Sequence, residues 1–362
     1  MSPTGPDRLF IDGSHGEGGG QILRTAVSLS AATGRPIRIE KIRAGRAKPG
    51  LAAQHLTAIR AAATIVGADV TGDTLGSATL EFQPGGAPVA GTYRVDVAEA
   101  REGGSAGAAS LVLQTVALPL ALAEGESTVT VMGGTHVPWS PPYDFLQDVW
   151  LATLRRLGLN ASARLDAWGF YPAGDGEITL QIAGAPSGSA ALLEPLPATD
   201  RGRLTGISGR AVAANLPSHI AQRMADRAEA LLRPLGVPVR INTERVRAVS
   251  PGAWIFLKPD YEAGCAGFGG HGRRGKPAEE VAEDAVAELM AHHQSGAVLD
   301  RHLSDQILLP LAFADGPSEF TSAAVTRHLE TNAWAIGQFG IAKIDIERAP
   351  DGTGHVMIFP LR

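Results

Sequence analysis

Cysteine is almost absent from this 362-residue chain, which contains only Cys265. A single thiol excludes an internal disulfide and a zinc site built on several cysteines, and such scarcity is typical of proteins from a reducing compartment. No stretch contains the roughly 18 uninterrupted apolar residues that a membrane-spanning helix requires, and the first residues lack a basic segment followed by an apolar run. We therefore expect a cytoplasmic protein with no membrane partner.

A large excess of positive charge is also missing, because the formal net charge is −5. Proteins that coat nucleic acid non-specifically neutralise many phosphates with Lys and Arg, so this class is disfavoured. The charge is nevertheless uneven. Six basic residues and one acidic residue lie between Arg38 and Arg60, a patch that suits either phosphate binding or a solvated surface.

One pattern of elements occurs three times along the chain. Each copy has an apolar segment with helical character, a turn with glycine, a β-like segment, a loop, a second helix and another strand. The first helices are expected at 21–30, 111–120 and 303–312, the strands after them at 37–39, 128–131 and 319–321, and the second helices near 51–66, 142–157 and 328–338. This pattern predicts an α/β (α+β) fold with a large domain built from repeated units.

Residues 187–296 break the period and contain a strand–helix–strand–helix pattern of their own, with helices at 220–232 and 278–292. The stretch 184–203 is rich in Pro and Gly and suits a linker at the entrance. We therefore predict a smaller inserted α/β domain at 187–296. The large, repeat-built catalytic domain would comprise residues 1–186 and 297–362.

A glycine-rich turn at 16–20 lies between an expected strand at 9–12 and the first helix. Glycines let the backbone approach a phosphate closely, and a helix N-terminus supplies N–H groups and partial positive charge. Glu17 fits among phosphates only if a cation lies between them, and magnesium is the natural candidate. A glycine-rich turn alone is more often structural, and neither the Gly-Lys-Ser/Thr phosphate loop nor the dinucleotide fingerprint is present in full.

A second loop carries Arg43, Arg46 and Lys48 among Gly and Pro residues and leads into Gln54 and His55. Three cations at the head of a helix form a good oxyanion clamp, which favours an RNA-phosphate site over a merely solvated loop.

Two further groups of segments carry chemistry only in combination. Residues 103–107 and 133–135 are rich in small residues, and Pro141 and Phe145 could pack against a flat base. Residues 302–306 and 327–332 each contain a histidine near a helix start, which is usually a structural or solvated residue.

Together these segments resemble the RNA 3′-terminal phosphate cyclase family. The resemblance runs over nearly the whole chain and is most specific at 16–24, 43–51, 111–115 and 304–306. It implies a large domain of three units, each with two helices and a four-stranded sheet, interrupted by a smaller α/β insert.

The resemblance also implies roles for individual residues. His328 matches the histidine that takes AMP from ATP, and Glu17 matches a glutamate that coordinates a metal ion, Mg²⁺ or Mn²⁺. Residues at the ATP pocket would be Gln114, Pro141, Phe145, His302, Leu303, Ser304, Asp305 and Gln306. Residues facing RNA or phosphates would be Arg24, Arg43, Arg46, Gln54 and His55.

The implied reaction converts the 3′-phosphate of an RNA into a 2′,3′-cyclic phosphate through a histidine–AMP adduct and an RNA(3′)pp(5′)A intermediate. Two segments depart from the family pattern: 168–176 begins with Trp168 where the family usually has Arg or His, and His302 replaces a common Tyr. Two rival functions are a non-catalytic ribosomal-RNA processing factor and an enolpyruvyl-transferase-type enzyme. Factors of the first kind lack the nucleophilic histidine. This chain has His328 in the matching context, so the first rival is disfavoured.

Overall fold

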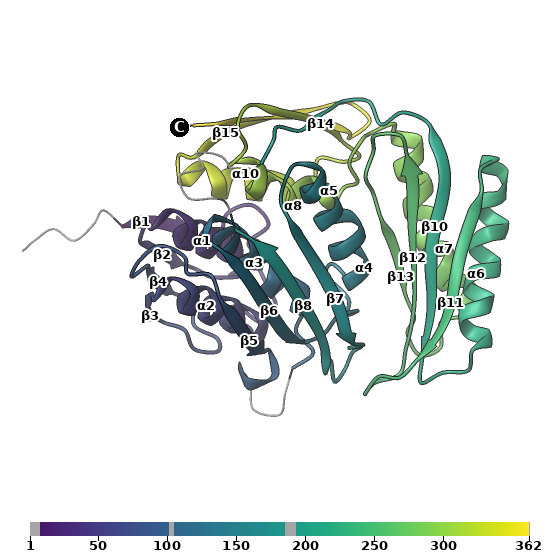
Figure 1. The fold of residues 1–362 in the computed structure, drawn as a ribbon, viewed down its shortest axis with the longest axis horizontal. Helices are drawn as coiled ribbons and strands as arrows, with labels where there is room; N and C mark the ends of the chain where they lie inside the picture. The colour runs from purple at the N-terminus through teal and green to yellow at the C-terminus, as the bar shows by residue number, and fades with distance from the viewer. Residues whose placement is uncertain (1–7, 101–104, 185–192, 362) are drawn as a thin grey trace, which may run out of the picture.

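The computed structural model describes residues 8–100, 105–184 and 193–361. Within these ranges the strands form four separate four-stranded sheets, each accompanied by helices (Figure 1). None of the helices in the described ranges is long and apolar enough to cross a membrane.

Three of the sheets share one topology. The first contains β1 (Leu9–Asp12), β2 (Ile37–Glu40), β4 (Leu80–Gln83) and β3 (Asp69–Thr71), in that order. The second contains β5 (Thr92–Asp96), β6 (Glu126–Gly133), β8 (Gly176–Ala183) and β7 (Ala161–Ala167). The third contains β9 (Pro197–Ala198), β14 (Ser318–Ser322), β16 (Gly354–Pro360) and β15 (Ala342–Arg348). In each sheet the first pair is parallel and the other pairs are antiparallel, so the predicted threefold repeat is confirmed.

The helices of the three units also correspond. The first helices are α1 (Gly20–Thr33), α3 (Ala109–Leu122) and the pair α8 (Leu303–Gln306) and α9 (Leu308–Leu311). The second helices are α2 (Ala53–Val66), the pair α4 (Tyr143–Phe145) and α5 (Leu151–Arg156) joined by a π-helical stretch, and α10 (Arg327–Gln338). Glycines with positive φ end α1 and α2, at Gly34 (φ 72°) and Gly67 (φ 59°).

The structure differs from the sequence-based expectation in the third unit, where the single helix predicted at 303–312 is interrupted at Ile307. Pro310 has no N–H, so it cannot donate to the carbonyl of Gln306 four residues earlier. The Trp150 Nε1–H bonds to this Gln306 carbonyl instead, at 3.2 Å. This hydrogen bond joins the third unit to the second.

The fourth sheet contains β11 (Val239–Val246), β10 (Leu204–Ala214), β12 (Gly252–Tyr261) and β13 (Phe268–His271), in that order. The strand that comes first along the chain, β10, lies inside this sheet, whereas in the three repeated sheets the first strand lies at an edge. This difference in strand order explains why the segment breaks the sequence period. Helices α6 (His219–Leu232) and α7 (Ala278–Ser295) cover it and share with it a separate hydrophobic core that includes Met224, Ile255 and Leu289. It lies at the right of the molecule in Figure 1.

The residues before this sheet belong to the third unit, because β9 pairs in parallel with β14. The described part of the fourth sheet therefore begins only at Leu204. The division of the chain at residues 187 and 296 into two domains stays a prediction.

Candidate active site

His328 and Gln21 meet where α10 and α1 begin. The Thr326 side chain caps α10 by accepting a hydrogen bond from the Leu329 N–H at 3.1 Å, which places His328 in the first turn with its side chain 52% exposed. His328 Nδ1 lies 2.8 Å from Gln21 Oε1. Because an amide oxygen only accepts, Nδ1 must carry the proton. The lone pair of the neutral imidazole is then on Nε2.

Asp305 holds the Gln21 side chain in place by accepting a hydrogen bond from it. The Gln21 amide Nε2 donates to Asp305 Oδ2 at 2.9 Å, and the Asn332 amide donates to the Asp305 carbonyl at 2.7 Å. Complete burial raises the pKa of Asp305 to about 7, although the Gln21 hydrogen bond and the charge of Arg24 act in the opposite direction. A continuous chain of hydrogen bonds thus runs from Asp305 through Gln21 to His328.

Glu17 lies beside His328 in the glycine-rich turn. Its backbone N–H donates to Thr331 Oγ1 at 3.0 Å, and its Oε1 forms an ion pair with Arg46. The other carboxylate oxygen, Oε2, is buried, has no hydrogen-bond partner among the described residues and lies 3.8 Å from His328 Nδ1. A Cβ on Gly19 would collide with this carboxylate, so the carboxylate lies directly against the backbone of the turn. A partly buried carboxylate oxygen without a donor is suited to a cation.

The side chains of His55 and Arg24 lie at the start of α1. A Cβ on Gly20 would collide with His55 Nε2 and would lie 3.1 Å from an Arg24 guanidinium nitrogen, so both side chains crowd this helix end. Burial, together with the charges of Arg24 and Arg43, lowers the pKa of His55 to about 3, and His55 Nδ1 accepts from the Ala52 N–H at 3.1 Å. Burial lowers the pKa of Arg24 to about 10, which leaves it charged at neutral pH.

The remaining residues expected at phosphates have partners within the protein. Arg43 Nη1 donates to the Gly50 carbonyl at 2.7 Å, and Gln54 Oε1 accepts from the Ala108 N–H at 3.0 Å. Each bond uses only part of the side chain's capacity, since a guanidinium has five N–H donors and an amide has two. The first turn of α2, which contains Gln54, therefore adjoins the start of α3.

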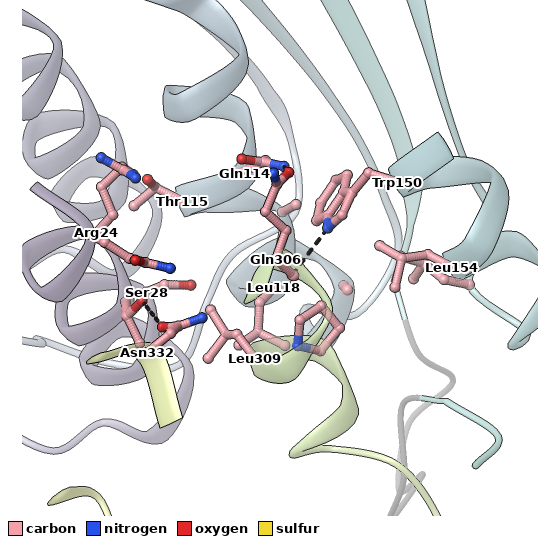
Figure 2. Close-up of a pocket in the computed structure, with 16 residues that line it drawn as sticks. Arg24, Ser28, Gln114, Thr115, Leu118, Trp150, Leu154, Gln306, Leu309 and Asn332 are labelled. Carbon is pink, nitrogen blue, oxygen red and sulfur yellow. Dashed lines mark hydrogen bonds between the residues drawn. The ribbon is translucent and has the colours of Figure 1, made fainter. Parts of the chain in front are cut away.

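The residues expected at the ATP pocket divide into two groups. Gln114 Nε2 donates to Gln306 Oε1 at 2.6 Å, and both side chains line a cavity that the first helices of all three units enclose (Figure 2). Arg24 lines the same cavity, which links it to the start of α1. His302 is exposed, and the Pro141 carbonyl accepts from Ser110 Oγ at 2.5 Å.

The second group is buried in the protein interior. Phe145, expected to pack against a base, is only 4% exposed and belongs to the hydrophobic core. Leu303 and Ser304 are fully buried, and Ser304 Oγ donates to the Asp300 carbonyl at 2.7 Å. These three side chains are interior residues and do not line the cavity shown in Figure 2.

No group of three or more His, Cys, Asp or Glu side chains that could hold a metal ion occurs in the part of the chain that the structure describes. Any metal at Glu17 would therefore need ligands from a bound phosphate or from water. Gly103 and Gly104, expected in a close-approach turn, lie outside the described residues, whereas Ser105 Oγ accepts from the Gly107 N–H at 3.2 Å.

Comparison with known proteins identifies the family. The family model described as RNA 3′-terminal phosphate cyclase matches residues 15–346. The chain belongs to this family. Proteins named RNA 3′-terminal phosphate cyclase are 55% identical in Methylococcus capsulatus (97% of this chain and 96% of that protein), 54% in Nostoc punctiforme (94% and 97%) and 42% in Archaeoglobus fulgidus (91% and 95%).

The departure of this cyclase-family chain at Trp168 has a structural counterpart. Trp168 stacks on the buried His136 with ring centroids 4.6 Å apart, and the Arg210 guanidinium of the fourth sheet lies 5.9 Å from the Trp168 ring centroid. A basic group is therefore present near the position where family members usually carry one in the sequence, but it comes from β10.

Asp144 is a buried residue next to the proposed pocket residue Phe145, and the sequence did not reveal its contacts. Its Oδ2 accepts from Trp254 Nε1 at 2.8 Å and lies 3.0 Å from His136 Nε2, while its Oδ1 lies 3.3 Å from Arg210. Burial alone would raise the pKa of Asp144, but His136, Arg210 and Trp254 together hold it below the ordinary value. Because Trp254 and Arg210 belong to the fourth sheet, this sheet contacts the segment between the proposed pocket residues Pro141 and Phe145.

Proposed function

We propose that this chain is an ATP-dependent RNA 3′-phosphate cyclase that converts a 3′-phosphate end to a 2′,3′-cyclic phosphate and releases AMP and pyrophosphate. The observation that carries the proposal is His328, half-exposed, with its Nδ1–H fixed by Gln21 and its Nε2 free. Family membership supplies the substrate class.

The first step would be attack of neutral His328 Nε2 on the α-phosphorus of ATP. An N–P bond forms, the bond to the pyrophosphate oxygen breaks, and the imidazole becomes positively charged. The Gln21 oxygen, already bonded to Nδ1–H, stabilises that charge, and Arg24 and Arg46 offset the charge on the phosphates.

Glu17 would hold a divalent cation, Mg²⁺ or Mn²⁺, through its unpartnered Oε2. Such an ion, shared with phosphate oxygens and water, would neutralise the developing negative charge. The ion pair on Oε1 leaves this second oxygen available.

In the second step the RNA 3′-phosphate would displace His328 from the α-phosphorus and form RNA(3′)pp(5′)A. Arg43, Arg46, Gln54 and His55 are the groups that we assign to this phosphate. The neighbouring 2′-hydroxyl then attacks the terminal RNA phosphorus and expels AMP, which is effectively an intramolecular reaction. A DNA end has no 2′-hydroxyl and cannot close the ring.

Incubation with ATP labelled at the α-phosphate tests the proposal. We expect acid-labile label on the protein, and its transfer to RNA that ends in a 3′-phosphate followed by a cyclic end. Absence of both label and cyclic product would favour the non-catalytic processing factor, and binding of phosphoenolpyruvate would favour the enolpyruvyl-transferase-type enzyme.

The labelling step should depend on pH in one direction. Partial burial and the charges of Arg24, Arg46 and Arg301 lower the pKa of His328 below its ordinary value of 6.5. Only the neutral imidazole attacks, so the rate of self-labelling should rise with pH through that lowered pKa and then level off. Single-turnover labelling between pH 5 and 8 measures the inflection.

An inflection above 6.5 in the parent protein that persists in Asp305→Asn would contradict this assignment. If the inflection disappears in the Asp305→Asn variant, the inflection reports the titration of Asp305, whose raised pKa affects His328 through Gln21.

Arg43→Ala should mainly weaken the RNA-dependent step. Loss of one charge-assisted contact costs about 1.5–3 kcal/mol, or roughly 10- to 100-fold in the KM for RNA. Arg43→Lys, which keeps the charge, is the control for the lost Gly50 contact. If Arg43→Ala retains the RNA affinity of the parent and its salt dependence, the side chain is only solvated.

A further inference from the structure

One end of the fourth sheet contacts the second unit. Ala248, just after β11, forms a β-bridge with Trp168, and the Ala173 N–H donates to Ser250 Oγ at 3.1 Å. A Cβ on Gly252, the first residue of β12, would collide with the Phe170 ring. The loop 168–175 of the second unit and the end of the fourth sheet therefore form one continuous surface.

This surface carries exposed aromatic and basic side chains. Trp139 is 101% and Tyr171 is 69% exposed. Arg247 follows β11, and Arg273 and Arg274 follow β13 beyond Gly272, whose N–H donates to Ala253 O at 2.8 Å. All three arginines are exposed, and none forms an ion pair with another described residue. We define these residues as the loop-edge surface: Trp139, Tyr171, Arg247, Arg273 and Arg274.

Hydrogen bonds connect the loop-edge surface to the candidate active site. The side-chain Oε1 of Gln54, in the first turn of α2, accepts from the Ala108 N–H, and the adjacent Gly107 carbonyl accepts from the Gly134 N–H at 2.8 Å. The His136 N–H donates to the Gly169 carbonyl at 3.0 Å, and the loop of Gly169 contacts the fourth sheet. The segments 105–108, 133–136 and 168–175 thus lead from Gln54, a proposed phosphate ligand, to the end of the fourth sheet that carries the three arginines.

We propose that single-stranded RNA upstream of the reacting 3′ end binds along the loop-edge surface. Exposed aromatic rings stack on unpaired bases without a strong sequence preference, and unpaired arginines attract the phosphates between them. The exposed Asp175, in the loop 168–175, is an acidic side chain close to the proposed RNA path. The inserted segment then holds the RNA whose end reacts elsewhere, an inference that rests on the proposed cyclase function.

The test compares a trinucleotide with a long unstructured RNA, both ending in a 3′-phosphate. For the triple variant Arg247→Ala, Arg273→Ala, Arg274→Ala, we expect the KM for the long RNA to rise about tenfold or more, while the KM for the trinucleotide changes little. The slope of log affinity against log salt should become shallower by about 2, since each lost single-strand phosphate contact contributes about 0.7.

Arg240→Ala, which removes one positive charge, is the matched control for the single variant Arg247→Ala. Arg240 is exposed on the same strand, β11, and lies seven residues before Arg247, about 23 Å away along the strand. For the aromatic residues, the double variant Trp139→Ala, Tyr171→Ala should weaken long-RNA binding, whereas Phe10→Ala, at a 66% exposed side chain of β1, should not.

Equal losses with both RNAs, or losses no larger than those of Arg240→Ala and Phe10→Ala, would overturn the proposal. Fluorescence anisotropy of the long RNA without ATP separates this inference from the proposed function. If self-labelling with ATP is absent but anisotropy depends on the three arginines, the cyclase proposal fails and the RNA surface stands. If labelling is present but long-RNA affinity is insensitive to the variants, the surface fails alone.

Discussion

Replacing His328 with Asn should abolish covalent attachment of AMP, and cyclisation of a 3′-phosphorylated RNA should fall by several orders of magnitude. The Asn side chain approximates the size of the imidazole and can still bond to Gln21, but it has no nucleophilic nitrogen lone pair. ATP binding should survive because the cavity lined by Gln114 and Gln306 is unchanged. Labelling with α-labelled ATP and equilibrium binding of ATP measure the two effects separately.

The same variant should still cyclise an RNA that is supplied already adenylylated at its 3′-phosphate. That last step needs positioning and the RNA's own 2′-hydroxyl, with no covalent histidine. His302→Asn is the control, because His302 is also exposed near α8 yet should slow labelling without removing it. Label retained by the His328→Asn protein and lost from the His302→Asn protein would show that the nucleophile is the other histidine.

The repeated fold could be predicted because its elements follow local rules. In β6, buried residues alternate with less buried ones, and the strand lies where the turn at Gly125 predicts it. The break at Ile307 could not be predicted in the same way. Pro310 was visible in the sequence, but proline is tolerated inside α3 at Pro119, and the deciding contact is the Trp150 side chain from another unit.

The candidate site was predictable only in part, for a related reason. The glycine-rich turn indicated phosphate binding, and Gln21 lies in the segment 16–24 that carries the family resemblance, yet its partner His328 lies 307 residues further along the chain. Asp144 gave no local signal, since its partner Trp254 is 110 residues away in the fourth sheet. Family resemblance supplied His328, but the tautomer that frees its Nε2 follows only from the folded arrangement.

Arg46 shows why a basic side chain cannot be assigned to RNA from the sequence alone. The sequence grouped it with Arg43 as a phosphate ligand, whereas the structure pairs it with the Glu17 carboxylate. Its charge lowers the pKa of His328, and in the proposed reaction it would also limit repulsion between Glu17 and incoming phosphates. Arg46→Ala should consequently alter self-labelling as well as RNA affinity, unlike Arg43→Ala.

Glu17→Gln should cut self-labelling about 100-fold at low metal concentration and raise the concentration of Mg²⁺ or Mn²⁺ needed for half-maximal labelling. The substitution keeps the shape of the side chain but removes the charge of the unpartnered Oε2, which costs several kcal/mol where an ion and phosphates meet. Binding of Mn²⁺ to the protein–ATP complex, followed by electron paramagnetic resonance, measures the same loss without relying on turnover.

A control variant separates the effect of losing the metal ligand from the effect of losing the Glu17–Arg46 ion pair. Arg46→Ala also breaks the Glu17–Arg46 pair but leaves the carboxylate, so it should change the rate while keeping the metal dependence of the parent. Folding should survive Glu17→Gln, because the backbone N–H of residue 17 still donates to Thr331. A Glu17→Gln protein with unchanged metal dependence and unchanged Mn²⁺ binding would remove Glu17 from the metal site. In that case its role would be limited to holding Arg46 beside His328.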